Sequence, residues 1–349
     1  MTLDRFFLVL LVFVPASLGA GWLSGSPAVV FVLSILALVP LAKFLSDATE
    51  SLAEHVGPAA GGLLNATFGN APELIISILA LSAGLVDVVK ASLVGSILGN
   101  LLLGLGLALF AGGIRRERQE FNVTAARSNV SVLLLAATAF TLPALFLLMN
   151  GISEAVIEHL SIAVSVLLLV GYVATLYFAL RTHKHLYIVE PDEDAVAWSV
   201  SRGLTVLLAA TIAVIFVSDA LVNSLTPLLA TLGWSPLFMG AIVLATAGNA
   251  AEYLAAIRAA VRNKITLATQ ISLGSATQIL LFVFPVIVLV SALIGKGMDL
   301  ELSIFELAAV VFAIFTANSI IEDGETNWLE GFLLVVVFCI VGAAFFFHP

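Results

Sequence analysis

The chain has 349 residues, of which 61 % are hydrophobic and 11 % charged, and its mean hydropathy is +1.15. Soluble domains carry about 25 % charged residues, so this composition excludes a soluble globular protein and most soluble enzymes. The net charge of −9 comes from 23 acidic and 14 basic residues, whose placement relative to a membrane matters more than their sum. Cys339 is the single cysteine, which excludes an intrachain disulfide and a paired-thiol metal site.

Eleven apolar runs are long enough to cross a hydrocarbon core of about 30 Å. In chain order, the predicted transmembrane helices cover residues 5–23, 28–46, 60–85, 87–112, 127–149, 157–181, 203–225, 236–261, 265–297, 303–320 and 328–347. The first run has a second interpretation as a cleaved signal peptide, because Arg5 precedes a short apolar core and small residues follow at 16–20. The runs are continuous rather than alternating, so we predict an all-α polytopic membrane protein with about 11 transmembrane helices and not a β-barrel.

The basic residues indicate the orientation. With the N-terminus in the cytoplasm, only Lys90 and Lys296 fall outside, as the positive-inside rule requires. The cytoplasmic set is Arg5, Lys43, Arg115, Arg116, Arg118, Arg127, Arg181, Lys184, Arg202, Arg258, Arg262 and Lys264. The C-terminus is then outside. The short termini favour a prokaryotic plasma membrane, with a eukaryotic vacuole as the alternative.

Two distant segments share one motif. Residues 66–73 (ATFGNAPE) and 245–252 (ATAGNAAE) are identical at six of eight positions, at an offset of 179 residues that also carries Gly95 onto Gly274. The repeated unit contains five spans, an odd number, so the second copy must enter the membrane from the opposite side. Inverted repeats of this kind are typical of secondary transporters, whose sites lie near the midplane where the repeats meet.

The repeats divide the chain into four predicted parts. These are an extra N-terminal helix at 1–27, a first five-helix repeat at 28–181, a cytoplasmic acidic linker at 182–202 and a second five-helix repeat at 203–349. The acidic run Glu190–Asp194 is interpreted as part of a solvated linker, with cytoplasmic cation sensing as the alternative.

Glu73 and Glu252 occupy equivalent positions of the two motifs, inside predicted spans. A carboxylate at membrane depth is costly and indicates function, and the alternative is an interhelical hydrogen bond from a protonated glutamic acid. Asn70 and Asn249 each precede a glutamate by three residues, so amide and carboxylate share a helix face. Oxygen ligands suit a hard cation such as Ca²⁺, and neither motif has a Cys or His that would favour a softer metal.

The next span of each repeat adds a second polar row. Ser96 and Asn100 are four residues apart, and Ser275 and Gln278 are three apart, so each pair can face the glutamate helix. For Asn100 and Gln278, a hydrogen bond that only holds helices together is an equally good interpretation.

Three further positions complete the predicted metal site. Pro72, an accessory position, has no N–H to bond the carbonyl of Phe68, which leaves that oxygen free to serve as a ligand or to meet water. The second motif has Ala251 in its place, so the two half-sites need not be equivalent. The first residue of each motif, Ala66 and Ala245, is included in the site.

These motifs resemble those of the calcium/proton antiporters of the calcium/cation antiporter superfamily. Residues 62–71 with Glu73, followed by 91–101, look like that family's first signature, and 248–252 followed by 274–279 look like its second. The resemblance implies a ten-helix core of two inverted five-helix repeats, a calcium site between the two glutamates, and exchange of calcium for protons.

The resemblance also assigns roles residue by residue. Glu73 and Glu252 match the family's cation and proton carboxylates, and the polar site positions are matched by Asn70, Asn249, Ser96, Ser275 and Gln278. Glu50 resembles a family acidic residue at the end of the first core helix, although from sequence alone it reads as part of a solvated helix face. The chain departs from the family at Tyr253, where His is usual, and at Pro72, which is closer to the related sodium/calcium exchangers.

The sequence therefore predicts a secondary antiporter, with Ca²⁺ and H⁺ as its transported partners. The resemblance implies that the second and seventh spans are its gates. Sodium coupling, transport of other divalent cations and a cation channel are the nearest alternatives. An intramembrane enzyme is disfavoured, because no HExxH motif occurs and neither His nor Lys falls beside Ser96 or Ser275. We expect no cofactor and no nucleic-acid partner, and the sequence does not fix an oligomeric state.

Overall fold

The computed structural model describes residues 3–23, 25–56, 61, 64–65, 67–147, 153–186 and 198–348. In this part of the chain, nine helices are long and apolar enough to span a membrane, and a bent pair at Pro236–Gly248 and Ala250–Val261 makes a tenth. A shorter apolar helix, Ala71–Ser82, falls in the third predicted span. The protein is thus an all-α polytopic membrane protein, as predicted.

The helices follow one another with few interruptions. Their bounds are α1 Leu3–Leu10, α2 Phe13–Trp22, α3 Pro27–Val56, α5 Ala71–Ser82, α6 Val86–Leu98, η1 Gly99–Gly104, α7 Leu105–Gly113, α8 Val123–Leu147, α9 Glu154–Tyr177, η2 Phe178–Thr182, η3 Lys184–Leu186, α10 Val200–Leu232, α11 Pro236–Phe238, η4 Met239–Leu244, α12 Ala245–Gly248, α13 Ala250–Val261, α14 Ile265–Gln278, η5 Ile279–Val283, α15 Phe284–Ile294, α16 Ile304–Ile321 and α17 Trp328–Phe347. Two short strands, β1 (Gln119–Glu120) and β2 (Glu325–Thr326), pair antiparallel and join the loops before α8 and α17.

Several predicted spans differ from the helices observed, among them the second, third and eighth. Helix α3 runs to Val56, well beyond the predicted end at residue 46, because its last turns carry polar residues that a hydropathy reading leaves out. The third span is interrupted by a turn at Gly69 and Asn70, between the helical residues 67–68 and α5, which begins at Ala71. The eighth span is broken at Asn249, where α12 and α13 meet at a bend of 54°.

The two repeats are visible in the backbone at the same offset of 179 residues. Helices α5 and α13 each have 12 residues, and each follows an asparagine, Asn70 or Asn249, whose backbone is not helical. Each ends in the same tight turn with one residue of positive φ, Gly84 at 81° and Asn263 at 65°. A left-handed turn favours Gly or Asn, so both copies meet one backbone requirement with different residues.

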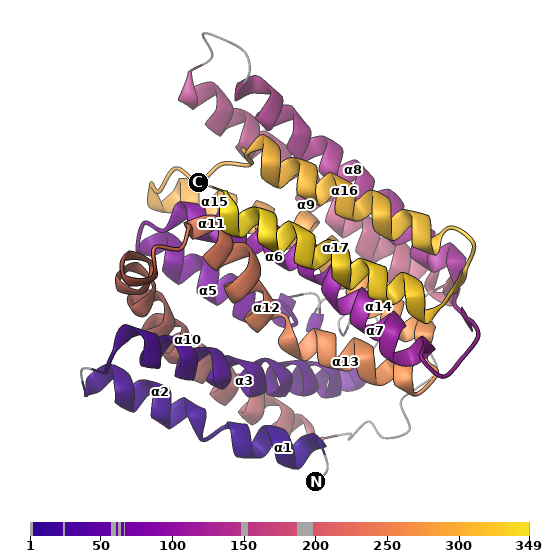
Figure 1. Cartoon of the computed structure of the whole chain (residues 1–349), viewed down its shortest axis with the longest axis horizontal. Coiled ribbons are helices and arrows are strands. Elements are labelled where there is room, and N and C mark those ends of the chain that lie inside the picture. Colours follow the sequence, from indigo (N-terminus) through magenta and orange to yellow (C-terminus); the bar gives the residue numbers. More distant parts are fainter. Residues whose placement is uncertain are drawn as a thin grey trace.

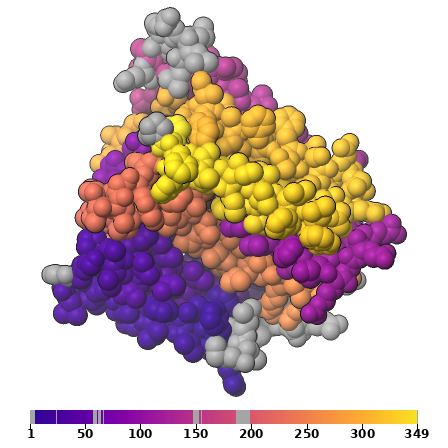
Figure 2. Space-filling view, viewed as in Figure 1, coloured from indigo at the N-terminus to yellow at the C-terminus, as the bar shows by residue number. Residues whose placement is uncertain are grey.

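The motif helices lie in the middle of the bundle. In Figure 1, α5, α6 and α12 lie between a lower group, α2, α3 and α10, and an upper group that includes α16 and α17. A hydrogen bond of 2.7 Å between the hydroxyls of Ser17 and Ser34 joins α2 to α3. The space-filling view shows the N-terminal helices at one edge and α17 across the same face (Figure 2).

The domain boundaries and the linker stay predictions. The acidic run Glu190–Asp194 lies outside the described residues. The end of the linker is described from Trp198, whose backbone N–H donates to the hydroxyl of Ser51 on α3 at 2.9 Å.

Small residues allow the central helices to approach closely. A Cβ atom at Gly95 on α6 would lie 2.0 Å from the carbonyl oxygen of Ala241 on η4, and one at Gly240 would lie 2.6 Å from that of Val88. Membrane helices use small residues in this way to bring their backbones together. Gly95 and Gly240 therefore bring the backbones of the two repeats into direct contact.

We expect Gly95→Ala to destabilise the protein by about 1 to 3 kcal/mol, because its methyl group must push α6 away from η4. Thermal unfolding of the purified protein measures the effect. Gly171→Ala on α9 is the matched control, since a Cβ there meets no atom within 4 Å. Equal melting temperatures for the two variants would contradict the close contact.

Candidate functional site

The site begins with two broken helices. Asn70 and Asn249 are the N-cap residues of α5 and α13, and Glu73 and Glu252 lie in the first turn of each helix. The N-terminal end of a helix carries partial positive charge from its free N–H groups, which favours a carboxylate there. The broken spans thus bring both glutamates to helix ends in the interior of the bundle.

Asn249 connects the second repeat to the first. Its amide nitrogen donates to the hydroxyl of Ser96 at 2.9 Å and to the carbonyl of Ala245 at 2.8 Å, and its oxygen accepts from the amide of Asn100 at 2.9 Å. The side chain is fully buried. Ser96 and Asn100 are on α6 and η1, so these bonds cross between the repeats.

The network continues to Glu252 through Ser275 on α14. The amide of Asn100 donates to the Ser275 hydroxyl at 2.9 Å, and that hydroxyl donates to Oε2 of Glu252 at 2.5 Å. On the other half, the amide of Asn70 donates to Oε1 of Gln278 at 2.5 Å. Each asparagine of a glutamate motif is therefore bonded to a polar residue of the opposite repeat.

Glu73 is the more deeply placed carboxylate, whereas Glu252 is half-buried. The Oε1 atom of Glu73 lies 3.5 Å from the position that a Cβ atom would take at Gly248, on the other repeat. The two glutamates are close enough to interact electrostatically. Among the described residues, neither Oε2 of Glu73 nor Oδ1 of Asn100 has a hydrogen-bond donor. Buried acceptors without donors are unfavourable unless a cation, a proton or water meets them.

Stretches of π-helix border the site. Asn100 lies in η1, Gln278 directly precedes η5, and η4 leads into α12. A π-helix is rare and is frequently found at functional sites. Sequence periodicity did not predict these segments.

The remaining predicted positions are placed less directly. Ala245 is buried and its carbonyl accepts the Asn249 amide, while Ala66 lies outside the described residues. Glu50 is exposed on α3. Pro72 is buried at the start of α5, but the second motif is also broken with Ala251 in that place, so proline is not what breaks the helix.

Tyr253 borders the site. In the sequence it stands out only as a departure from the family pattern, which usually has His at this position. Its ring fills a notch where a Cβ at Gly99 would lie 2.0 Å from the Tyr253 hydroxyl oxygen and one at Gly104 would lie 2.6 Å from Cδ1. The hydroxyl is buried and has no hydrogen-bond partner among the described residues. In the sequence, the signal for this contact was the spacing of Gly99 and Gly104, which are five residues apart. The π-helix η1 is what makes both glycines face the Tyr253 ring.

The possible ligand atoms in the site are oxygens. In the described part of the chain, no three His, Cys, Asp or Glu side chains come together, and the site instead combines two carboxylates with amide and hydroxyl groups. Such a set suits a hard cation or protons. The Ser275 hydroxyl donates its hydrogen to the Glu252 carboxylate and is part of this oxygen set.

Comparison with known proteins identifies the family of the chain. The family model described as "Sodium/calcium exchanger protein" matches residues 26–181 and 202–347. A Ca²⁺/H⁺ antiporter of Synechocystis is 46 % identical, with the alignment covering 100 % of this chain and 99 % of the relative. The Ca²⁺/H⁺ antiporter ChaA of Bacillus subtilis is 42 % identical, covering 98 % of each chain.

Solved structures match over the same length. The structure of native YfkE superposes with a TM-score of 0.87 at 40 % identity, covering 98 % of this chain and 100 % of that one. The H⁺/Ca²⁺ exchanger CAX has a TM-score of 0.75 over 99 % of this chain and 92 % of its own, and at 18 % identity it shows the fold alone. The chain belongs to the sodium/calcium exchanger family and, within it, to the calcium/proton antiporters, which are secondary transporters and not enzymes.

Proposed function

We propose that the protein exchanges Ca²⁺ for H⁺ across the membrane by alternating access, and that both ions compete for Glu73 and Glu252. The observation that carries this proposal is the hydrogen-bonded network that joins each glutamate motif to the opposite repeat, from Asn249 to Ser96 and from Asn70 to Gln278, and reaches Glu252 through Ser275. It gathers carboxylate, amide and hydroxyl oxygens at two helix ends in the interior of the bundle. The relatives named as Ca²⁺/H⁺ antiporters support the choice of ions.

Coupling follows from the charge of the pair. Two carboxylates close together in a medium of low dielectric repel one another and need a neutralising partner. Protons can supply it, and so can one divalent cation. Calcium binds only deprotonated carboxylates, so its binding releases protons, and proton binding expels calcium. Exchange is then a direct consequence of one shared site.

Helices α3 and α10 are the proposed gates. They pack along one another, and each also contacts a motif helix of the opposite repeat: α3 contacts α12 and α13, and α10 contacts α5. Movement of this pair against the rest of the bundle would open a path to the glutamates from one side of the membrane or the other.

The distribution of basic residues supports an orientation with the N-terminus in the cytoplasm and the C-terminus outside, in a prokaryotic plasma membrane.

We expect proteoliposomes containing the purified protein to take up Ca²⁺ when a pH gradient is imposed, and not when a sodium gradient is imposed at constant pH. Uptake of ⁴⁵Ca²⁺ measures both, with protein-free vesicles as the control. Uptake driven only by sodium would move the protein to sodium coupling. Calcium flux without any counter-ion would contradict antiport and favour a channel.

Selectivity among divalent cations, including Mn²⁺ and Zn²⁺, is measured in the same vesicles by adding each unlabelled cation in competition with ⁴⁵Ca²⁺. An oxygen-only site predicts that Ca²⁺ competes better than Zn²⁺, which prefers nitrogen and sulfur ligands.

A further inference from the structure

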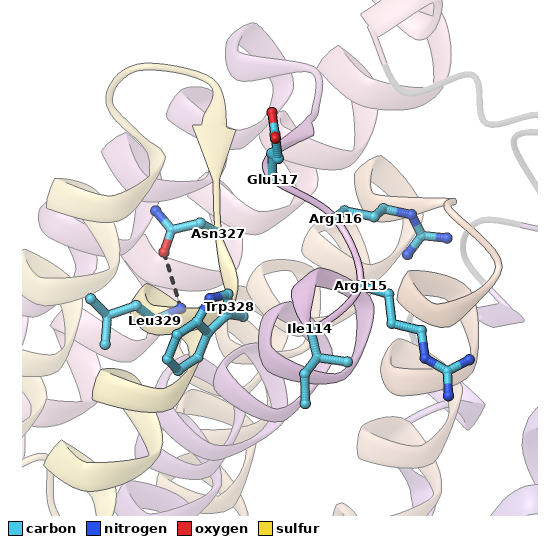
Figure 3. Close-up of a pocket in the computed structure, with 7 residues that line it drawn as sticks. All are labelled: Ile114, Arg115, Arg116, Glu117, Asn327, Trp328 and Leu329. Carbon is cyan, nitrogen blue, oxygen red and sulfur yellow. Dashed lines mark hydrogen bonds between the residues drawn. The ribbon is translucent and has the colours of Figure 1, made fainter.

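A cavity of about 540 Å³ lies at the end of the bundle that the basic residues assign to the cytoplasm, apart from the glutamate site. It is formed where the loop after α7 meets the start of α17 (Figure 3). Its lining residues are Ile114, Arg115, Arg116, Glu117, Asn327, Trp328 and Leu329. Neither the exchange mechanism nor the motifs give these residues a role.

The cavity carries positive charge that is not neutralised locally. Arg115 is exposed, and its guanidinium makes no hydrogen bond or ion pair with any residue that the structure describes. Arg116 donates to the carbonyl of Gly112 at 2.5 Å and to that of Val261 at 3.3 Å, which fixes the loop against the end of α13.

The acidic groups nearby do not cancel this charge. In Figure 3 the carboxylate of Glu117 points away from both arginine side chains of the loop. Glu325 and Glu120 are engaged by Arg118, at 3.2 Å and 3.6 Å. At the start of α17, the Asn327 side chain accepts from the backbone N–H groups of Leu329 and Glu330.

The other wall of the cavity is apolar and exposed. Ile114 is 57 % exposed, Trp328 45 % and Leu329 47 %. The exposed apolar surface continues along α17 through Phe332 and Leu333. Tryptophan is enriched at the level of lipid headgroups, and a row of exposed apolar side chains below it on a spanning helix faces acyl chains. The cavity therefore joins a cationic edge to a lipid-facing helix.

We propose that this cavity binds an anionic phospholipid, with the phosphate at Arg115 and an acyl chain along Ile114, Trp328 and the exposed face of α17. Charge complementarity favours this occupant, because basic pockets on the cytoplasmic side of membrane proteins match the negative headgroups of that leaflet. A soluble anion would use the guanidinium but would make no use of the apolar wall beside it. A bound lipid would brace the loop after α7 against α17.

The test measures lipid binding to the purified full chain by native mass spectrometry, with phosphatidylglycerol and phosphatidylcholine added at matched concentrations. We expect phosphatidylglycerol to bind preferentially, and Arg115→Gln to weaken that binding about tenfold through loss of a charge-assisted contact. Arg118→Gln is the matched control, because Arg118 lies in the same loop but does not line the cavity and is already paired with Glu325. It is expected to keep the preference.

Three outcomes would overturn the proposal. They are equal binding of the two lipids, an equal loss in both arginine variants, and displacement of the lipid by inorganic phosphate at the same concentration. Calcium uptake by Arg115→Gln in phosphatidylcholine vesicles should equal that of the unmodified protein, which shows that the variant is folded and that the lipid site is separate from the exchange site.

Discussion

Replacing either Glu73 or Glu252 by glutamine is expected to lower Ca²⁺ uptake by at least about a hundredfold while leaving the protein folded. Glutamine keeps the size and the hydrogen-bonding capacity of the side chain but removes the negative charge that a divalent cation needs. Loss of an outer-shell partner of a metal already reduces affinity by about 10 to 100-fold, and a carboxylate that contacts the ion should matter more. Uptake of ⁴⁵Ca²⁺ driven by a pH gradient measures the effect.

Glu306→Gln is the matched control for this pair. Glu306 is also buried, at 8 % exposure like Glu73, but it belongs to a capping box at the start of α16, where its carboxylate accepts from Ser303. Glutamine serves as well as glutamate in a capping box, so this variant should keep both its stability and its uptake. Uptake at the unmodified rate in either Glu73→Gln or Glu252→Gln would contradict the two-glutamate mechanism.

Asn249→Ala should have the next largest effect, because one side chain holds three contacts at the centre of the site. Its removal leaves the Ser96 hydroxyl and the Asn100 amide without their bonds to Asn249. Each polar group left unsatisfied in a buried place costs about 1 to 3 kcal/mol. We expect a lower melting temperature and a Ca²⁺ concentration for half-maximal uptake that rises about tenfold or more.

Asn223→Ala provides the comparison for that variant. Asn223 is exposed on α10 and donates only to Asp219 one turn earlier, at 3.1 Å. Surface pairs of this kind contribute little to stability, so melting temperature and uptake should both stay near the unmodified values. If Asn249→Ala behaves like Asn223→Ala, the network is not what holds the site together.

The fold was predictable from sequence to the level of spans and repeats. Long apolar runs identify helices because the bilayer demands continuous apolar surface, and a repeated motif of identical residues reveals the second copy. Helix ends were less predictable. The break before α13 depends on the backbone of Asn249, and the extension of α3 to Val56 depends on packing, and neither leaves a hydropathy signal.

The residues of the candidate site were predictable from the sequence, but the hydrogen bonds between them were not. The motif identified Glu73, Glu252 and their neighbouring asparagines, but the sequence could not show that Asn249 bonds to Ser96 across the repeats. The π-helical spacing of η1, which places Gly99 and Gly104 under the Tyr253 ring, is a tertiary effect that has no periodic signature. Which polar residues meet is decided by the crossing of helices far apart in the chain.

The measurement that tests the central claim most directly is the release of protons when Ca²⁺ binds to the purified protein in weakly buffered solution. A shared site predicts that Ca²⁺ displaces protons, that its apparent affinity falls as the pH is lowered, and that Glu252→Gln reduces the number released. The direction follows because protonated carboxylates must lose their protons before they can bind the cation. Calcium binding of constant affinity across the pH range, with no proton released, would show that the two ions do not share these glutamates.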